Sequence, residues 1–210
     1  MFAKYTLRAD EMFLNRMIGG TFEGSNDPDF REKEVLYLIN EKPKRLQTVV
    51  QSYSSKSYRY VRYIGPKDSH CNIAEAAFYT PNDTASLKGK VIGTPGCFQK
   101  DGSHEYTNVF DGDVTTSFDY IEPSGGWSGL DLGTPKQIGR IVYTPRSYDN
   151  YIRSGDDYEL FYCARRNNWK SLGDQRSKAD SLIYIKIPVN ALLLLCNNTR
   201  GIQERIFVYT

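Results

Sequence analysis

Residues 108–133, NVFDGDVTTSFDYIEPSGGWSGLDLG, constrain the fold of this chain more than any other stretch. An acidic loop opens the stretch, in which Asp111 and Asp113 flank a glycine and Thr115 and Thr116 follow. Glycine permits a sharp bend that turns oxygens inward, and carboxylate and hydroxyl oxygens are ligands that calcium prefers. The same pattern is typical of an Asx turn between strands, so spacing alone leaves both interpretations open. The closing WSGLDLG is an alternating strand pattern that ends in a turn.

The composition also favours β-structure. The 210 residues include 16 Tyr and 10 Phe, which suit pleated, half-buried surfaces. Hydrophobic residues make up 40%, enough for the packed core of one large or two small domains. The 27 Lys and Arg nearly balance the 25 Asp and Glu, which argues against a nucleic acid held by phosphate contacts. The sequence has no run of roughly 18 apolar residues and no signal peptide at its start, so no membrane insertion is expected.

Three motifs, in this order, resemble the discoidin, or coagulation factor 5/8 type C, family. They are FDGD-x-x-T from Phe110, W-x-G-L-D-L-G from Trp127, and I-G-R-I-x-Y-x-P-R from Ile138. The resemblance covers about residues 87–210. It implies an antiparallel β-sandwich of the jelly-roll (galactose-binding-like) type, a structural calcium ion, and ligand binding through loops at one end. In this family, such modules are often carbohydrate-binding and attached to bacterial glycan-degrading enzymes.

The chain also contains an internal repeat. The sequence EAAFYT of residues 75–80 resembles ERIFVYT of residues 204–210 with one residue inserted. A Gly-flanked strand precedes each copy, in residues 20–26 and in residues 155–162. The first copy therefore looks like the later strands of the same fold.

The repeat predicts two tandem modules. Because no DGD loop precedes the first copy, residues 1–83 are expected to hold only the later strands, and residues 84–210 to form the complete module. The short polar segment of residues 80–86 is the expected linker. An incomplete sandwich leaves strand edges unpaired, so we expect a fragment cut inside a domain. Packing of the half-domain on the second module or on another copy are the alternatives.

Several local patterns give further predictions. Residues 138–143 and residues 183–187 alternate as strands, and helical signals are limited to residues 29–34. Trp127 is expected to point into the core. The four cysteines form no CxxC pair, so we expect free thiols; a Cys163–Cys196 bridge is the alternative.

The resemblance implies the residues of the calcium site. Asp111, Asp113 and Thr116 would supply oxygens from the acidic loop, and Glu204 in the last strand would complete the cage. The ion would be structural, because it would tie this loop to the C-terminal strand. Glu75 has no DGD loop in its own copy, so no cation is expected there.

The loop PRSYDNYIR of residues 145–153 is the predicted ligand site. It offers planar guanidinium groups, which bind paired hydroxyls or a carboxylate through two hydrogen bonds, beside aromatic and amide side chains. A solvated hairpin loop of the same composition is the alternative. The expected contacts are Arg146, Tyr148, Asp149, Asn150 and Arg153, with Tyr120 as a second wall.

These features predict a non-catalytic module that binds a glycan or glycoprotein. It would be an accessory region of a larger extracellular, periplasmic or cell-surface protein, with an attached catalytic domain outside this chain. A protein–protein or cell-adhesion module and a structural spacer are the alternatives. An enzyme is not expected, since only His70 and His104 are present and Leu130 replaces the closing glycine of a nucleophile elbow.

Overall fold

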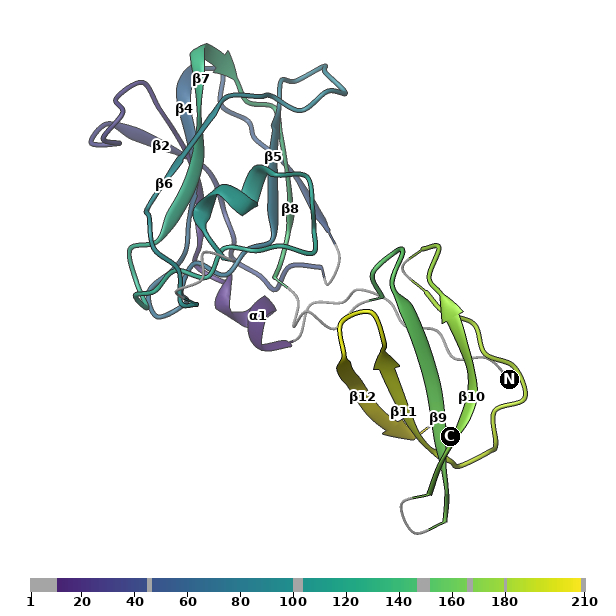
Figure 1. The fold of residues 1–210 in the computed structure, drawn as a ribbon. Helices are drawn as coiled ribbons and strands as arrows, with labels where there is room; N and C mark the ends of the chain where they lie inside the picture. Colours follow the sequence, from purple (N-terminus) through teal and green to yellow (C-terminus); the bar gives the residue numbers. More distant parts are fainter. Residues whose placement is uncertain are drawn as a thin grey trace. The chain divides into compact units, whose positions relative to one another are not determined.

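The computed structural model of the protein describes residues 11–44, 47–99, 104–146, 152–165, 168–179 and 181–208. The chain is nearly all β and its strands pair antiparallel, which confirms the predicted fold class. In these ranges the helices are α1 (Glu11–Arg16) and the 3-10 turn η1 (Tyr106–Phe110), and none is long and apolar enough to cross a membrane. Two compact units divide the chain: the N-terminal unit, Ala9–Tyr148, and the C-terminal unit, which contains residues 149–210 (Figure 1).

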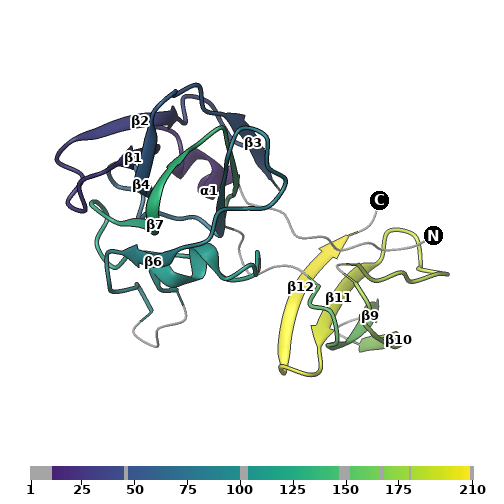
Figure 2. The same ribbon diagram turned by 90° about the horizontal axis from the view of Figure 1, so that it is seen from above.

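The N-terminal unit is a sandwich of two antiparallel sheets. Its five-stranded sheet has the order β2 (Lys33–Leu38), β1 (Thr21–Ser25), β4 (Ser57–Ile64), β7 (Trp127–Gln137), β6 (Lys90–Gly93). Its three-stranded sheet has the order β3 (Thr48–Gln51), β8 (Arg140–Thr144), β5 (Glu75–Tyr79). Seen from above, β2, β1, β4, β7 and β6 follow one another in this order, and β3 of the smaller sheet lies to one side of them (Figure 2).

Aromatic side chains form the centre of this sandwich. The ring of Phe22, on β1, lies 5.1 Å from Tyr63 and 5.2 Å from Tyr143, and meets Phe78 edge-on at 6.0 Å. Strand alternation explains the arrangement, because every second residue of β1, β4 and β8 points to the same inner face. Burial of these large rings is the main favourable term that holds the two layers together.

The expected boundary near residue 83 is wrong, because strands from both sides of it complete one sandwich. Val61 of β4 pairs with Leu130 of β7, and Glu75 of β5 pairs with Thr144 of β8. The expected linker, residues 80–86, instead connects β5 to β6 inside the unit. Residues 21–79 thus supply the later strands, and residues 90–144 supply the strands that the first copy was thought to lack.

The outer face of the five-stranded sheet carries a buried ion pair. Arg62 donates from Nε to Glu23 at 2.8 Å, and its guanidinium lies 4.0 Å above the ring of Phe30. Trp127 is half-buried and packs against Phe30 at 5.8 Å. It therefore covers Arg62 on this face, at 5.1 Å, instead of pointing between the sheets as expected.

The segment of residues 29–34 is not a helix. The side chain of Asp27 accepts hydrogen bonds from the backbone nitrogens of Asp29 and Arg31, each at 3.0 Å, which fixes a turn. Short polar side chains compete with the helix in this way. The turn carries Phe30, whose φ of 54° is left-handed, onto the sheet.

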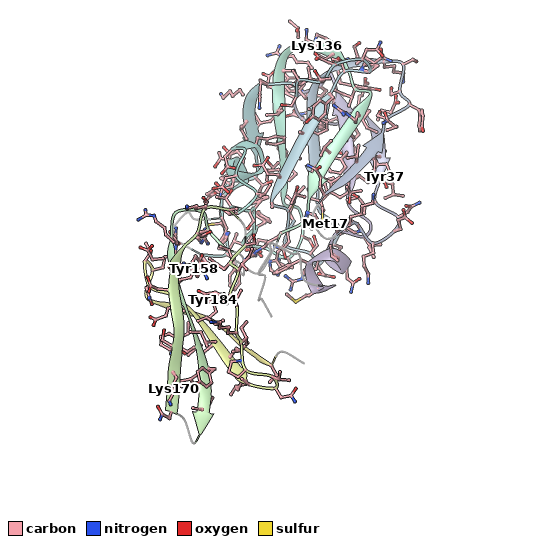
Figure 3. The ribbon with its side chains drawn as sticks, turned by 90° about the vertical axis from the view of Figure 1, so that its right-hand side faces the viewer. Met17, Tyr37, Lys136, Tyr158, Lys170 and Tyr184 are labelled. Atoms are coloured by element: carbon pink, nitrogen blue, oxygen red, sulfur yellow. The ribbon has the colours of Figure 1, made fainter. Side chains whose placement is uncertain are left out.

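The described residues of the C-terminal unit form one sheet. Its order is β10 (Asn168–Arg176), β9 (Asp157–Arg165), β11 (Leu192–Asn197), β12 (Ile202–Val208). A small core lies on one face, where Leu182 and Tyr184 pack on Tyr158 and its neighbours (Figure 3). The second module expected over residues 84–210 does not form, since its first strands belong to the N-terminal unit.

Candidate functional site

The acidic loop folds as a compact turn directly after η1. Gly112 adopts a φ of 84°, and the Asp111 carboxylate accepts hydrogen bonds from the Asp113 nitrogen at 2.7 Å and from the Thr116 hydroxyl at 2.8 Å. Asp113 in turn accepts a hydrogen bond from the Thr115 nitrogen at 2.9 Å. The loop therefore has the Asx geometry that the sequence allows, and it also gathers the oxygens that a hard cation requires.

Glu75, the first residue of β5, is the partner that the structure gives to this loop. Its carboxylate accepts a hydrogen bond from the Gly112 nitrogen at 2.9 Å. Burial, and then the neighbouring Asp111 carboxyl group, raise the pKa of Glu75 to about 8. Two carboxyl groups in contact repel each other when both are charged, so either a proton or a cation must relieve this pair near neutral pH.

The predicted fourth ligand, Glu204, lies in β12 of the C-terminal unit, whereas Asp111, Asp113 and Thr116 lie in the N-terminal unit. Glu75 occupies the position beside the acidic loop that was expected for Glu204. The expectation that Glu75 has no DGD partner was wrong for the same reason as the domain boundary. Among the described residues, no group of three or more His, Cys, Asp or Glu side chains converges, so hydroxyl and carbonyl oxygens would have to fill the rest of a calcium shell.

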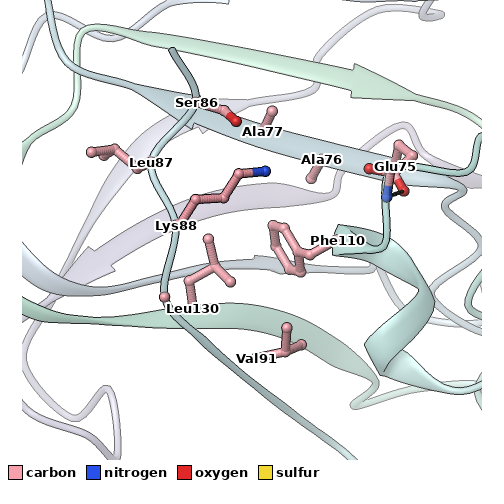
Figure 4. A pocket seen from close by; sticks show the side chains of 11 residues that line it. Glu75, Ala76, Ala77, Ser86, Leu87, Lys88, Val91, Phe110 and Leu130 are labelled. Atoms are coloured by element: carbon pink, nitrogen blue, oxygen red, sulfur yellow. Dashed lines mark hydrogen bonds between the residues drawn. The ribbon is translucent and has the colours of Figure 1, made fainter.

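A cavity of about 240 Å³ lies beside this loop. Strand β5 contributes Glu75 and alanines to one wall, and the start of β6 and the segment before it form the other (Figure 4). Figure 4 shows the side chains of Phe110, Leu130 and Lys88 between these two walls. Glu75 thus lines the cavity and also contacts the acidic loop through Gly112.

A second candidate site lies on the loops between strands of the N-terminal unit. The ring of Phe98 is 63% exposed and meets His70 edge-on at 6.2 Å. Ile121, which is 41% exposed, follows Tyr120, whose backbone forms a bridge with Cys97 next to Phe98. We call these three residues the Phe98 surface. Exposed apolar residues that lie together can form a binding surface, so these three residues are a candidate site.

Short backbone contacts fix the position of the Phe98 surface. The Phe98 nitrogen donates to the Asp119 carbonyl at 2.8 Å, and the Tyr120 nitrogen donates to the His70 carbonyl at 2.8 Å. Nδ1 of His70 lies 3.0 Å from the Tyr120 carbonyl, which can only accept, so Nδ1 carries the proton. Tyr120, a predicted ligand contact, is half-buried and holds these loops together through its backbone.

Backbone strain marks the His70 loop. Asp68, His70 and Cys71 all have left-handed φ angles, of 59°, 55° and 52°. The Pro123 carbonyl holds the loop by accepting hydrogen bonds from the nitrogens of Ser69 at 2.9 Å and His70 at 3.0 Å. Residues in such conformations cost free energy and cluster at ligand-binding sites.

Arg146 does not present its guanidinium to solvent as predicted. Its side chain is 12% exposed, forms an ion pair with Asp119, and lies 5.0 Å above the ring of Phe13 on α1. Asp119 also accepts a hydrogen bond from Asn72 at 2.6 Å. The pair therefore fastens the end of β8 to the loop that supports the Phe98 surface.

The other predicted ligand residues do not form one described site. Tyr148, Asp149 and Asn150 lie outside the described residues. Arg153 belongs to the C-terminal unit, where its backbone nitrogen donates to the Tyr158 hydroxyl at 2.8 Å. Sequence reasoning missed Phe98 and His70, because a lone Phe or His in a loop has no distinguishing pattern. The repeat did contain a signal for Glu75, which aligns with Glu204.

Comparisons with known proteins give no further assignment: no family model, curated protein or solved structure matches the chain.

Proposed function

We propose that this protein is a non-catalytic carbohydrate-binding module with a discoidin-like sandwich. The observation that carries the proposal is the Phe98 surface, an exposed aromatic ring on loops at the edge of a β-sandwich. The apolar face of a sugar ring stacks on such an aromatic ring, and the exposed ring loses little conformational freedom on binding. The glycan or glycoprotein would therefore bind over Phe98.

Polar groups beside Phe98 would orient the sugar. Since Nδ1 of His70 donates to Tyr120, Nε2 is left to accept a hydrogen bond from a sugar hydroxyl. The exposed Lys67 and Asp68 lie in the same strained loop and offer a donor and an acceptor. Pre-organised loops lower the ordering cost of binding, which favours recognition of a ligand at this site.

The acidic loop fits a structural calcium ion. Its donor set is all oxygen, and the contact between the Glu75 and Asp111 carboxyl groups has no basic partner among the described interactions. Glu75, Asp111, Asp113 and Thr116 would hold the ion. When bound, it would supply positive charge that neutralises this contact, so that the loop after η1 stays tied to β5.

A non-catalytic role is consistent with the described side chains. Nδ1 of His104 lies 3.1 Å from the Ser117 hydroxyl, a contact that suggests a nucleophile and its base. Both residues are more than nine-tenths buried, so a substrate would not reach the hydroxyl. We interpret this contact as one that satisfies a core histidine.

In this proposal the module is an accessory region of a larger extracellular or cell-surface protein that processes glycans or glycoproteins, with the catalytic domain outside this chain. A protein–protein adhesion module is the second candidate. It is favoured by the apolar character of Phe98 together with Ile121, since paired exposed hydrophobic residues also suit a protein partner.

A glycan-array screen of the full chain tests the proposal, with Phe98→Ala as the variant and Tyr53→Ala as its matched control. Tyr53 is 93% exposed in another loop of the same unit, so neither change should affect folding. We expect binding to a defined sugar that Phe98→Ala abolishes and Tyr53→Ala retains. Silence across the array, or equal binding by both variants, would refute the glycan site at Phe98.

A further inference from the structure

The cavity beside β5 combines an apolar interior with polar groups of opposite charge. Its volume is about 240 Å³, and every residue that lines it is among the described ones. Its charged side chains are Glu75 and Lys88, and Ser86 adds a hydroxyl group. Its apolar side chains come from β5, β6, β7, η1 and the segment before β6, and are Ala76, Ala77, Leu87, Val91, Phe110 and Leu130. Such a lining is typical of a site for a small ligand with apolar and polar parts.

Close contacts fix the walls of this cavity. The Leu87 nitrogen donates a hydrogen bond to the Phe78 carbonyl at 2.7 Å, which ties the segment before β6 to the end of β5. Gly89 passes so close to β7 that a Cβ atom there would lie 2.3 Å from the Asp131 carbonyl oxygen. Phe110 stacks on Phe78 at a centroid distance of 6.3 Å. The cavity is thus pre-formed, so few of its side chains would have to become ordered when a ligand binds.

The segment before β6 brings two hydrogen-bond donors to the cavity. Among the described residues, neither the Lys88 ammonium group nor the Ser86 hydroxyl has an ion pair or a hydrogen bond. Figure 4 shows the Lys88 side chain in the space between this segment and β5. An ammonium group supplies three donors and a hydroxyl supplies one, and both bind an ionised acceptor more strongly than a neutral one. This side of the cavity therefore favours a carboxylate.

Glu75, on the wall formed by β5, limits the charge of the ligand. Its carboxyl group accepts a hydrogen bond from the Gly112 nitrogen at 2.9 Å, and its remaining lone pairs can accept another from a ligand hydroxyl. Asp111 and Asp113 follow in the loop that Glu75 contacts. These acidic groups would repel a second anionic group on the ligand. The cavity thus favours a molecule with one carboxylate and several hydroxyl groups.

The volume of the cavity limits the ligand to one ring. An engineered apolar cavity of about 150 Å³ holds a benzene molecule, and pockets for drug-sized ligands begin at about 300 Å³. At about 240 Å³, this cavity lies between the two and suits a six-membered ring with its substituents. The C–H groups of the ring would pack on Phe110 and Leu130, as apolar surface does on an aromatic ring.

We propose that this cavity binds a hydroxylated ring acid with a single carboxylate, that is, a uronic acid, either free or at the end of a glycan chain. Lys88 and Ser86 would donate hydrogen bonds to the carboxylate, and Glu75 would accept one from a ring hydroxyl. The site is separate from the Phe98 surface, so Phe98→Ala should leave it unchanged.

An NMR titration of the isotope-labelled full chain with glucuronate, in EDTA, tests the proposal. We expect saturable shifts of the backbone amides of Ala76, Ala77 and Gly89. Glucose lacks the carboxylate and cyclohexanecarboxylate lacks the hydroxyls, so each should bind at least about tenfold more weakly. A disaccharide with a terminal glucuronate distinguishes the two sources: the same shifts would indicate the end of a glycan, and their absence would indicate the free acid.

Three variants test the residues. Lys88→Gln should weaken glucuronate binding at least about tenfold, because a charge-assisted contact is lost. Lys90→Gln is the matched control: Lys90 is an exposed lysine two residues further on, pairs with Asp131 in the sheet and does not line the cavity. Ala77→Leu keeps every charge but fills the cavity, so it should abolish binding. Equal melting temperatures of the two glutamine variants would show that a loss of binding does not come from unfolding.

Any of four results would overturn the proposal. The first is the absence of saturable shifts at the cavity, and the second is equal binding of glucose and glucuronate. The third is equal binding by Lys88→Gln and Lys90→Gln. The fourth is binding that appears only when calcium replaces EDTA, which would mean that an ion at the acidic loop holds the carboxylate instead of Lys88. The glycan-array test of the Phe98 surface is unaffected by each of these outcomes.

Discussion

The two units of the molecule begin with the same three strands and complete them differently. In the N-terminal unit the free edge of β4 pairs with β7, while in the C-terminal unit the free edge of β11 pairs with β12. The counterpart of β12 is β5, which lies in the second sheet beside β8. The last strands β5 and β12, which have similar sequences, thus take different places. β12 pairs with the edge of β11, whereas β7 occupies the edge of β4 and β5 pairs with β8 in the second sheet.

The second layer differs in the same way. Strands β3, β8 and β5 cover the N-terminal sheet and enclose a large aromatic core. The C-terminal sheet is covered on its core face by residues such as Leu182 and Tyr184, which belong to no strand. Since buried apolar area is the main source of stability, the N-terminal unit should be the more stable of the two.

The largest expected effect comes from matched core truncations in the two units. Phe22 and Tyr158 occupy corresponding positions in β1 and β9, and both are fully buried. Phe22→Ala should lower the unfolding free energy of the N-terminal unit by about 3–5 kcal/mol. Tyr158→Ala should lower the unfolding free energy of the C-terminal unit by a similar amount. Because the core of this unit is smaller, the variant should unfold it.

Hydrogen exchange of the full chain, read by mass spectrometry in increasing denaturant, measures both effects in one experiment. Each variant should reduce amide protection in its own unit and leave the other unit unchanged. Loss of protection in both units from either variant would mean that they fold as one body, and would break the comparison.

A slightly smaller loss of unfolding free energy is expected from a substitution on the outer face of the five-stranded sheet, where the two units also differ. Arg62 faces Glu23 across β4 and β1, whereas Cys196 faces Glu159 at the corresponding register. Arg62→Met should cost about 3 kcal/mol, because it leaves the Glu23 carboxylate buried with Lys33 at 2.7 Å and the Thr21 hydroxyl at 3.4 Å as its remaining partners among the described residues.

Arg59 on the same strand is the control for this variant. Its two hydrogen bonds to Asp131, at 2.8 and 2.9 Å, lie at the surface, so Arg59→Met should lower the unfolding free energy much less than Arg62→Met does. Urea denaturation compares the two variants. Equal costs would show that the covering by Phe30 and Trp127 does not isolate Arg62 from water.

The next smaller effect is stabilisation by calcium, which we expect in the N-terminal unit. If the ion is held by the acidic loop with Glu75, a concentration about 100 times the Kd should stabilise the chain by about 2.7 kcal/mol. Glu75→Gln should remove most of this gain in melting temperature, and Glu204→Gln should leave it intact. The reverse result would place the site in the pairing that the sequence implies, between the acidic loop and β12.

The smallest effect is a pH dependence at the edge strand β2. Hydrogen bonds from the Tyr58 hydroxyl, then from Ser54 and Lys56, lower the pKa of Glu34 to about 2. This stabilisation is complete above the ordinary pKa of a glutamate and is lost as pH falls through about 2. Because Glu34 lies at the surface, Glu34→Gln should lower the melting temperature by no more than a few degrees at pH 7, and by nothing near pH 2.

Much of the fold could be predicted from local pattern. Alternating apolar residues identify the strands around Trp127 and Ile138, and the DGD loop folds as its spacing suggests. Pattern could not choose the partner of β7, because residues 57–64 and residues 192–197 are both apolar strands at equivalent places in the repeat. The order of the motifs suggested a partner for β7 in the C-terminal part of the chain. This wrong partner led to the wrong domain boundary near residue 83.

The candidate site was predictable only in part. The acidic loop was found from its residues, but the glutamate predicted as its fourth ligand was taken from the wrong copy of the repeat. Arg146 was chosen for the chemistry of its guanidinium, and burial against Phe13 and Asp119 could not be foreseen from composition. Phe98 became a candidate only once the fold showed that its ring is exposed.

The central claim is that β7 pairs with β4 and not with a strand of the C-terminal unit. Nitrogen-resolved NOE spectra of the full chain test it directly, through the contacts of the Leu130 backbone. The structure predicts cross-strand NOEs from Leu130 to Val61 on one side and to Val91 on the other. NOEs from Leu130 to residues of β11 instead would contradict the claim, and would restore the module of residues 84–210.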